Sequence, residues 1–204
     1  MHNLPINEVR RLQIENDVLK TDNAKSNQLV CELERKISLL ENGLNFFKVH
    51  PKIAAGIKGE ILIVKAVTGE RTIRNASHDL NASRQEIKIE VKFSNANPVS
   101  STNPSLRWSW NKVTGQQGKK QYDRLILVGE KLPNFIHQYK DPSCPYILYD
   151  IPFEGVFDLT TGGEKQKSRM IRFPIDLDSI YADGGKKCQK FETTIAELEA
   201  QYGL

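Results

Sequence analysis

The sequence predicts an α/β protein in which a mixed β-sheet is flanked by helices and preceded by a long coiled-coil helix. Heptad-spaced apolar residues fill the first segment, helical periodicity follows at residues 53–67, and strand-length apolar runs come after them. Helices and strands in this order are typical of one packed domain. We therefore expect residues 1–48 to form a dimerisation helix and residues 49–204 to form a single α/β domain.

The composition is that of an ordinary globular protein. Of the 204 residues, 39% are hydrophobic and 26% are charged. No apolar run approaches the roughly 18 residues that a membrane span needs, and the N-terminus lacks the apolar core of a signal peptide. The three cysteines lie far apart and show no zinc-site spacing. We expect reduced thiols, a cytoplasmic location and no membrane partner.

The net charge of +4 is unevenly distributed. Residues 1–50 hold seven basic and seven acidic side chains, so the whole excess lies in residues 51–204. An excess of this size permits a nucleic-acid partner without requiring one. An anionic partner is therefore expected to bind the α/β domain.

The first segment has the pattern of a coiled coil. With Val9 at heptad position a, nine of the twelve a and d positions up to Phe47 are apolar, and the polar three are Asn16, Asn23 and Ser26. A seam this narrow over nearly six heptads favours a coiled coil over a helix packed on a domain, which shows a wider apolar stripe. A basic-zipper protein is excluded, because only about eight residues precede the heptads and no basic cluster lies among them.

The asparagines favour two parallel strands, since Asn at position a pairs best across an in-register dimer. In that arrangement two pairs of opposite charge face each other: Glu15 with Lys20, and Lys36 with Glu41. We expect a parallel homodimer, with antiparallel or intramolecular packing as the alternatives. Pro51 is expected to end the helix.

The elements of the α/β domain follow in order. The helix at 53–67 is stopped by Thr68 and Gly69, and a capping box from Thr194 to Glu197 opens a short terminal helix. Residues 94–121 are expected to be irregular, and 184–187 to be a turn. The expected strands are 72–74, 86–93, 122–128, 146–151, 155–159 and 170–173.

The strand at 86–93 carries the residues with chemical meaning. Its side chains alternate, so Glu86, Lys88, Glu90 and Lys92 share one face, opposite four apolar residues. Asp79 precedes it. Two carboxylates from neighbouring strands suit Mg²⁺, and a lysine on the same face can hold the attacking water and offset charge on a phosphate.

These residues resemble a known family. Glu60 in a helix, Asp79, the "EVK" of residues 90–92 in an apolar strand, and the later apolar strand "YDRLILVG" resemble the PD-(D/E)XK nucleases, within which they look like type II restriction endonucleases. The resemblance covers roughly residues 53–130. It implies a restriction-endonuclease-like core of mixed sheet and helices, and Mg²⁺-dependent hydrolysis of double-stranded DNA by water.

The resemblance also implies roles for particular residues. Asp79 and Glu90 would be metal ligands together with the Val91 carbonyl, and Lys92 would position the water. Glu60 would serve a second metal or orient a ligand. His78 stands where the family often has proline. Glu86 and Lys88 fit the same Glu-x-Lys spacing, so either pair could be the catalytic one; the interval from Asp79 and the polar Ser94 after Lys92 favour the second pair.

Other residues are candidates for DNA contact. Ser94 follows the catalytic strand, and a basic, amide-rich stretch comes later. Lysine and arginine bind phosphates, and glutamine can read adenine edges. The candidates are Ser94, Arg107, Lys112, Gln116, Gln117, Lys119 and Lys120, with a second ribbon at Lys165, Lys167, Arg169 and Arg172. Trp108 and Trp110 share a strand face and are expected in the core, and His78 is expected in a hydrogen-bonded turn.

The sequence thus predicts a homodimeric, Mg²⁺-dependent restriction endonuclease that cuts double-stranded DNA. Two alternatives stay open. One is a nuclease acting on repair intermediates or branched junctions. The other is a coiled-coil scaffold with a DNA-binding domain and no catalysis.

Overall fold

The computed structural model describes residues 6–72, 76–82, 86–101, 105–114, 120–161, 169–179 and 181–203. The chain divides into two compact units, Met1–Pro51 and Lys52–Leu204. No helix in these ranges is both long enough and apolar enough to cross a membrane.

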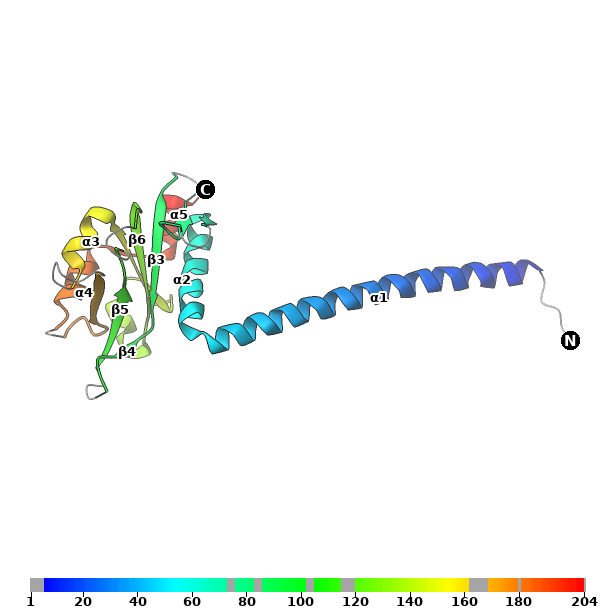
Figure 1. Ribbon diagram of the computed structural model, residues 1–204, viewed down its shortest axis with the longest axis horizontal. Helices are drawn as coiled ribbons and strands as arrows, with labels where there is room; N and C mark the ends of the chain where they lie inside the picture. Colours follow the sequence, from blue (N-terminus) through cyan, green and yellow to red (C-terminus); the bar gives the residue numbers. More distant parts are fainter. Residues whose placement is uncertain are drawn as a thin grey trace. The chain divides into compact units, whose positions relative to one another are not determined.

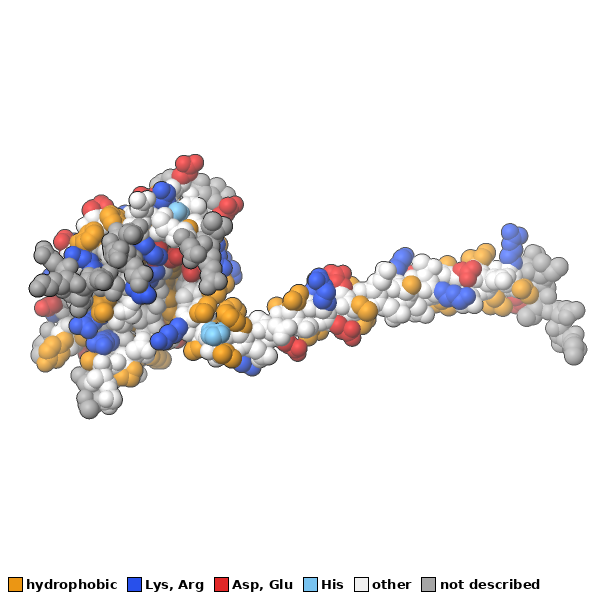
Figure 2. All heavy atoms as spheres, viewed as in Figure 1, with side chains coloured by type: hydrophobic (Ala, Val, Ile, Leu, Met, Phe, Trp, Pro, Cys, Tyr) orange, Lys and Arg blue, Asp and Glu red, His pale blue; other side chains and the backbone are white. Residues whose placement is uncertain are grey.

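The first unit is one long helix, α1 (Ile6–Val49, 44 residues). Its heptad-core side chains are exposed; Leu12 and Leu33, for example, are 47% and 49% accessible. Hydrophobic side chains reach the surface along the whole helix, between basic and acidic ones (Figure 2). α1 ends at Val49, and Pro51 is the first residue of the next helix, α2 (Pro51–Val67). At the first position of a helix the missing N–H of proline costs nothing, because that N–H would have no partner within the helix.

The second unit is built on a six-stranded mixed sheet. Its central strand β3 runs parallel to β6, and the other four pairs of neighbouring strands in this sheet are antiparallel. In spatial order the strands are β1 (Glu70–Arg71), β2 (Leu80–Asn81), β3 (Lys88–Ser94), β6 (Arg124–Glu130), β7 (Tyr146–Pro152) and β9 (Glu192–Thr193). The α/β class with a mixed sheet flanked by helices is therefore confirmed.

Each face of this sheet has its own core. Ile126 and Val128 face α2 and α5 (Ile195–Tyr202), while Leu125 and Leu127 face the opposite side. That second side is covered by a smaller sheet of β4 (Asn97–Pro98), β5 (Leu106–Asn111) and β8 (Met170–Pro174), with α3 (Phe153–Leu159) and α4 (Asp183–Gln189). Figure 1 shows these layers, with α2 and α5 on one side of β3 and β6 and the smaller sheet on the other.

The two tryptophans join the sheets. Trp108 and Trp110 are 0% and 1% exposed, and their indole N–H groups donate to the carbonyls of Glu130 at 2.8 Å and Val128 at 3.0 Å. The expected core packing of the tryptophans is confirmed. The expectation that residues 94–121 are irregular was wrong, because they contain β4 and β5; the tryptophans and the pairing with β8 fix β5 as a strand.

Two further expectations were wrong. Residues 155–159 lie in helix α3 instead of a strand, because Val156 and Leu159 are buried together at helical spacing. Residues 184–187 lie in α4 instead of a turn, where the helix buries Gly185 and Cys188. The capping box of α5 is confirmed, with Thr194 accepting from the Glu197 N–H. Of the strand expected at 72–74, only residue 72 is described; β1 ends before it.

Candidate functional site

Asp79 is fixed beside β3 by its own main chain. Its N–H donates to the Ile89 carbonyl at 3.0 Å, and its carbonyl accepts from the Thr72 N–H at 2.9 Å. β2 pairs with β3 at only two positions, and beyond them the Asp79 carboxylate takes the next place in the ladder. Its Oδ2 accepts a hydrogen bond from the Val91 N–H at 2.9 Å. The carboxylate is thereby held against the middle of β3.

Glu90 is a buried carboxylate. Its side chain is 0% exposed, although it belongs to the strand face that the sequence marks as charged. It lies on the side of β3 that also carries Ser94, whose Oγ accepts from the Ser109 N–H of β5 at 2.9 Å, so the smaller sheet covers this face. Glu90 Oε1 pairs with two lysines, whereas Oε2 is buried without a hydrogen-bond partner in the described structure.

Three oxygen atoms converge on the ammonium group of Lys92. It forms an ion pair with Glu90 Oε1 and lies 3.4 Å from the Val91 carbonyl oxygen and 3.9 Å from Asp79 Oδ2. The structure therefore brings Asp79, Glu90, Val91 and Lys92 together, as the sequence predicted for their positions. Their roles stay a prediction.

Lys120 completes this group, although the sequence suggested it only as a DNA contact. Its ammonium pairs with Glu90 Oε1 across thirty residues of sequence. Asp123 explains why Lys120 lies close to Glu90. The Asp123 carboxylate accepts a hydrogen bond from the Lys88 N–H at 2.8 Å, and the Asp123 N–H donates to the Lys88 carbonyl, also at 2.8 Å. The segment entering β6 is thus tied to the start of β3. We call Asp79, Glu90, Lys92 and Lys120 the acid–lysine cluster.

The charges in the acid–lysine cluster shift one another. Burial raises the pKa of Glu90, and the Asp79 charge adds to this, while Lys92 and Lys120 lower it in part. Burial alone would lower the pKa of Lys92, but the carboxylates of Glu90 and Asp79 outweigh burial and raise it. Lys92 therefore stays positively charged at neutral pH. Burial and the nearby Glu90 also raise the pKa of Tyr122.

The alternative pair, Glu86 and Lys88, lies outside the acid–lysine cluster. Both side chains are exposed, and neither has a hydrogen bond or ion pair to Asp79 within the described ranges. Glu86 has a left-handed backbone, with φ of 52°, which breaks the strand's alternation before Lys88. Glu90 and Lys92 therefore lie beside Asp79, and Glu86 and Lys88 do not.

Glu60 has a different partner. Its Oε2 accepts from Arg71 Nε at 2.9 Å and from a terminal guanidinium nitrogen at 2.5 Å. This pair joins α2 to β1. Where the structure is described, Glu60 makes no hydrogen bond or ion pair with Asp79, Glu90 or Lys92.

The DNA-contact candidates fall into separate groups. Ser94 is buried, and its hydroxyl bonds to the main chain of Asn95 and Ser109. Arg107 is half-buried on β5, and Lys112 is exposed after it. Gln116, Gln117 and Lys119 lie outside the described residues, as do Lys165 and Lys167. Arg169 lies over the Phe157 ring, and Arg172 is exposed on β8.

His78 lies in a hydrogen-bonded turn, as expected. Its two ring nitrogens lie 2.6 Å from Asn81 Oδ1 and 3.1 Å from Ser77 Oγ. The ring is thus occupied locally, close to Asp79 but not part of the acid–lysine cluster.

The cluster offers oxygen ligands to a cation. No group of three or more His, Cys, Asp or Glu side chains that could hold a metal ion occurs in the described parts of the chain. Mg²⁺, however, is often bound by one or two carboxylates together with waters. Asp79 Oδ2, Glu90 and the Val91 carbonyl already surround one positive charge, and Glu90 Oε2 lacks a partner. This donor set fits a hard divalent ion.

Neither a scan against protein-family models nor a search of the curated proteins found a match to this chain.

Proposed function

We propose that the protein is a Mg²⁺-dependent DNA endonuclease with a PD-(D/E)XK-like core. The observation that supports it best is the convergence of Asp79, Glu90 and the Val91 carbonyl on a single positive charge, with one Glu90 oxygen left unpaired in a buried position. A buried carboxylate oxygen without a partner is costly. Such a cost is expected where a ligand completes the site.

In this proposal Asp79, Glu90 and the Val91 carbonyl hold Mg²⁺. When bound, the ion would polarise the phosphate and lower the pKa of a bound water. Lys92 and Lys120 would then leave Glu90 and turn toward the substrate, where one ammonium orients the water and the other offsets charge on the phosphate. The water oxygen forms a bond to phosphorus as the bond from phosphorus to the leaving sugar oxygen breaks; the attacking water gives up one proton to solvent, and the leaving oxygen takes one proton from solvent.

Plasmid cleavage tests this proposal. We expect wild-type protein with Mg²⁺ to cut double-stranded DNA, and Asp79→Asn and Lys92→Met to lose at least about a hundredfold in rate, a loss typical of removing one electrostatic contact to the reacting group. Lys88→Met is the matched control because it removes an exposed lysine from the same strand. An active Lys92→Met protein beside an inactive Lys88→Met protein would move the site to Glu86 and Lys88.

The products separate the kinds of function. Discrete fragments favour a restriction enzyme, and nicking confined to branched or damaged DNA favours a repair nuclease. Retardation of DNA with no cleavage in Mg²⁺ would instead favour a non-catalytic scaffold.

A restriction enzyme of this kind would act as a homodimer through α1. The exposed heptad seam supports this, since an isolated helix gains little from leaving apolar side chains in water. A two-fold dimer would present one acid–lysine cluster to each strand of a palindromic site.

A further inference from the structure

The α/β domain has a cavity that is lined by none of the residues of the acid–lysine cluster. This cavity of about 720 Å³ lies beside the smaller sheet and is lined by residues of β5, β8, η2 (Pro133–Gln138) and the segment that leads into α4. Its size falls in the range of small-molecule pockets, roughly 300–1,000 Å³. The side chains that define its chemistry are Arg107, Thr161, Arg172, Phe135, Asp176 and Tyr181.

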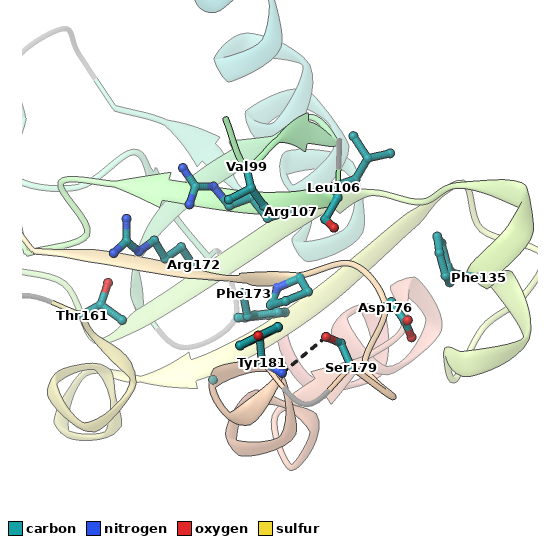
Figure 3. A pocket seen from close by; sticks show the side chains of 13 residues that line it. Val99, Leu106, Arg107, Phe135, Thr161, Arg172, Phe173, Asp176, Ser179 and Tyr181 are labelled. Carbon is teal, nitrogen blue, oxygen red and sulfur yellow. Dashed lines mark hydrogen bonds between the residues drawn. The ribbon is translucent and has the colours of Figure 1, made fainter. Parts of the chain in front are cut away.

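One end of the cavity is cationic. In the β5–β8 register Arg107 lies opposite Pro174, and Arg172 lies opposite Ser109. The two arginines are therefore diagonal neighbours on the face opposite the buried Trp108 and Phe173. Their guanidinium groups are directed the same way (Figure 3). Across the residues that the structure describes, no carboxylate lies within ion-pair distance of either one. Two unpaired guanidinium groups side by side suit a phosphate, which accepts paired N–H donors.

The opposite end of the cavity has aromatic rings and a carboxylate that can accept a hydrogen bond. Phe135 and Asp176 lie there, with Tyr181 between them and the arginines (Figure 3). Tyr181 is 78% exposed, so its ring is accessible for stacking. Asp176 Oδ1 accepts from Gln138 Nε2 at 3.2 Å and from the Asp178 N–H at 3.1 Å. Its other oxygen has no such partner within the described structure, so it can accept from an amino group.

We infer that this cavity binds a nucleotide unit, with the phosphate at Arg107 and Arg172 and the base against Tyr181 and Phe135. Asp176 accepts a hydrogen bond from the exocyclic amine of the base. The ligand is either a free nucleotide or a nucleotide in a DNA strand. Only the DNA form rests on the proposed nuclease function, for which it supplies a subsite outside the acid–lysine cluster.

Binding measurements test the inference. Wild-type protein is titrated with deoxyadenosine 5′-monophosphate by calorimetry and with a fluorescent single-stranded oligonucleotide by anisotropy. We expect Arg107→Gln and Arg172→Gln each to weaken binding about tenfold or more, and Tyr181→Ala to weaken it by roughly tenfold through lost stacking. For the oligonucleotide, each lost arginine also lowers the salt dependence of binding.

Lys65→Gln is the matched control, because it removes one exposed positive charge from α2, on the other face of the main sheet. Binding of the mononucleotide indicates a free-nucleotide site, and binding of the oligonucleotide alone indicates a DNA subsite. Wild-type affinity in the double arginine variant overturns the inference. So does failure of both probes to bind, including the case in which a phosphotyrosine peptide binds instead.

Failure of this inference is distinct from failure of the nuclease proposal. Lys92→Met lies outside the cavity, so it should bind the mononucleotide with wild-type affinity even where cleavage is lost. A protein that cuts DNA but whose arginine variants bind as wild type would keep the proposed function and lose the nucleotide cavity.

Discussion

Burial of the Glu90 carboxylate costs free energy, and its ion pairs with Lys92 and Lys120 offset only part of that cost. A carboxylate removed from water loses several kcal/mol of hydration, which close ion pairs repay in part. Lys92 and Lys120 share one oxygen of Glu90, while the other oxygen has no partner in the described structure. A residue in this state favours binding of an additional positive charge.

The first prediction concerns that added charge. A ligand that binds only the folded state raises the free energy of unfolding, by about 2.7 kcal/mol at a concentration of one hundred times its dissociation constant. We expect Mg²⁺ to raise the melting temperature of wild-type protein, as measured by scanning calorimetry. Glu90→Gln and Asp79→Asn should lose this shift. Glu86→Gln, in the alternative Glu-x-Lys pair, should keep it; loss of the shift in that variant alone would contradict the assignment.

Cys188 gives a prediction that depends on pH. It is buried in α4, and burial raises the pKa of its thiol from 9.0 to about 12. Between these values the unfolded chain binds fewer protons than the folded protein, so the free energy of unfolding falls as pH rises, by about 1.4 kcal/mol per unit. We expect the stability advantage of wild type over Cys188→Ala to shrink between about pH 9 and pH 11 in urea unfolding. An advantage that is constant over this range would show that the thiol does not contribute.

At the scale of elements, the contact between the two sheets depends on one glycine of β6. A Cβ at Gly129 would lie 2.9 Å from the Trp108 ring and 2.9 Å from the Ile147 side chain. Trp108 cannot retreat easily, because it is fully buried and its indole N–H is bonded to Glu130. The close approach of the smaller sheet to β6 therefore needs a residue without a side chain.

We accordingly predict that Gly129→Ala destabilises the protein by about 1–3 kcal/mol, the usual cost of overpacking a core. The matched control is Gly56→Ala in α2, where an added Cβ meets nothing within 4 Å. That variant should be stabilised by about 0.5–1 kcal/mol, since glycine is unfavourable inside a helix. Chemical unfolding measures both. Equal effects in the two variants would show that Trp108 moves without cost.

The sequence predicted the long elements better than the short ones. β3, β6, β7 and β8 each show an alternating or continuous apolar run over at least five residues, which is the pattern that periodicity detects. Strands of two residues, such as β1 and β9, have no period to detect. Helix α3 was mistaken for a strand because a seven-residue segment holds only two turns, too few to separate the two periods.

At the scale of the whole molecule, α1 presents a seam that a second copy of the chain would cover. Leu40 lies at heptad position d, while its neighbour Leu39 lies at position c, outside the seam; both are exposed, at 73% and 60%. Burying a leucine stabilises by roughly 1.5–3 kcal/mol, and burying a charge in its place opposes association.

We predict a dimer for the wild-type chain in sedimentation equilibrium. Leu40→Glu should raise the dimer dissociation constant at least about tenfold, whereas Leu39→Glu should leave it unchanged. Equal weakening by both variants would show that the heptad register is different, and a monomeric wild type would remove the dimer from the proposed function.

For the candidate site, too, local sequence patterns predicted only some of the residues that the structure brings together. Asp79 directly precedes β2, and Glu90 and Lys92 lie on the adjacent strand β3 after a short connection, so their spacing in the sequence was enough to predict that they lie together. Lys120 lies in the segment that leads into β6, and only the parallel pairing of β3 with β6 brings it to Glu90. Its place in the cluster depends on topology, which no local pattern specifies.

That parallel pairing also bears on how the molecule assembles. β3 and β6 cannot join until the connection between them, which holds β4 and β5, has closed, and such distant contacts form slowly. During refolding, amide protons of the β2–β3 hairpin should gain protection from exchange before those of β6. The two lysines would then reach Glu90 at different times, and simultaneous protection of both strands would refute this order.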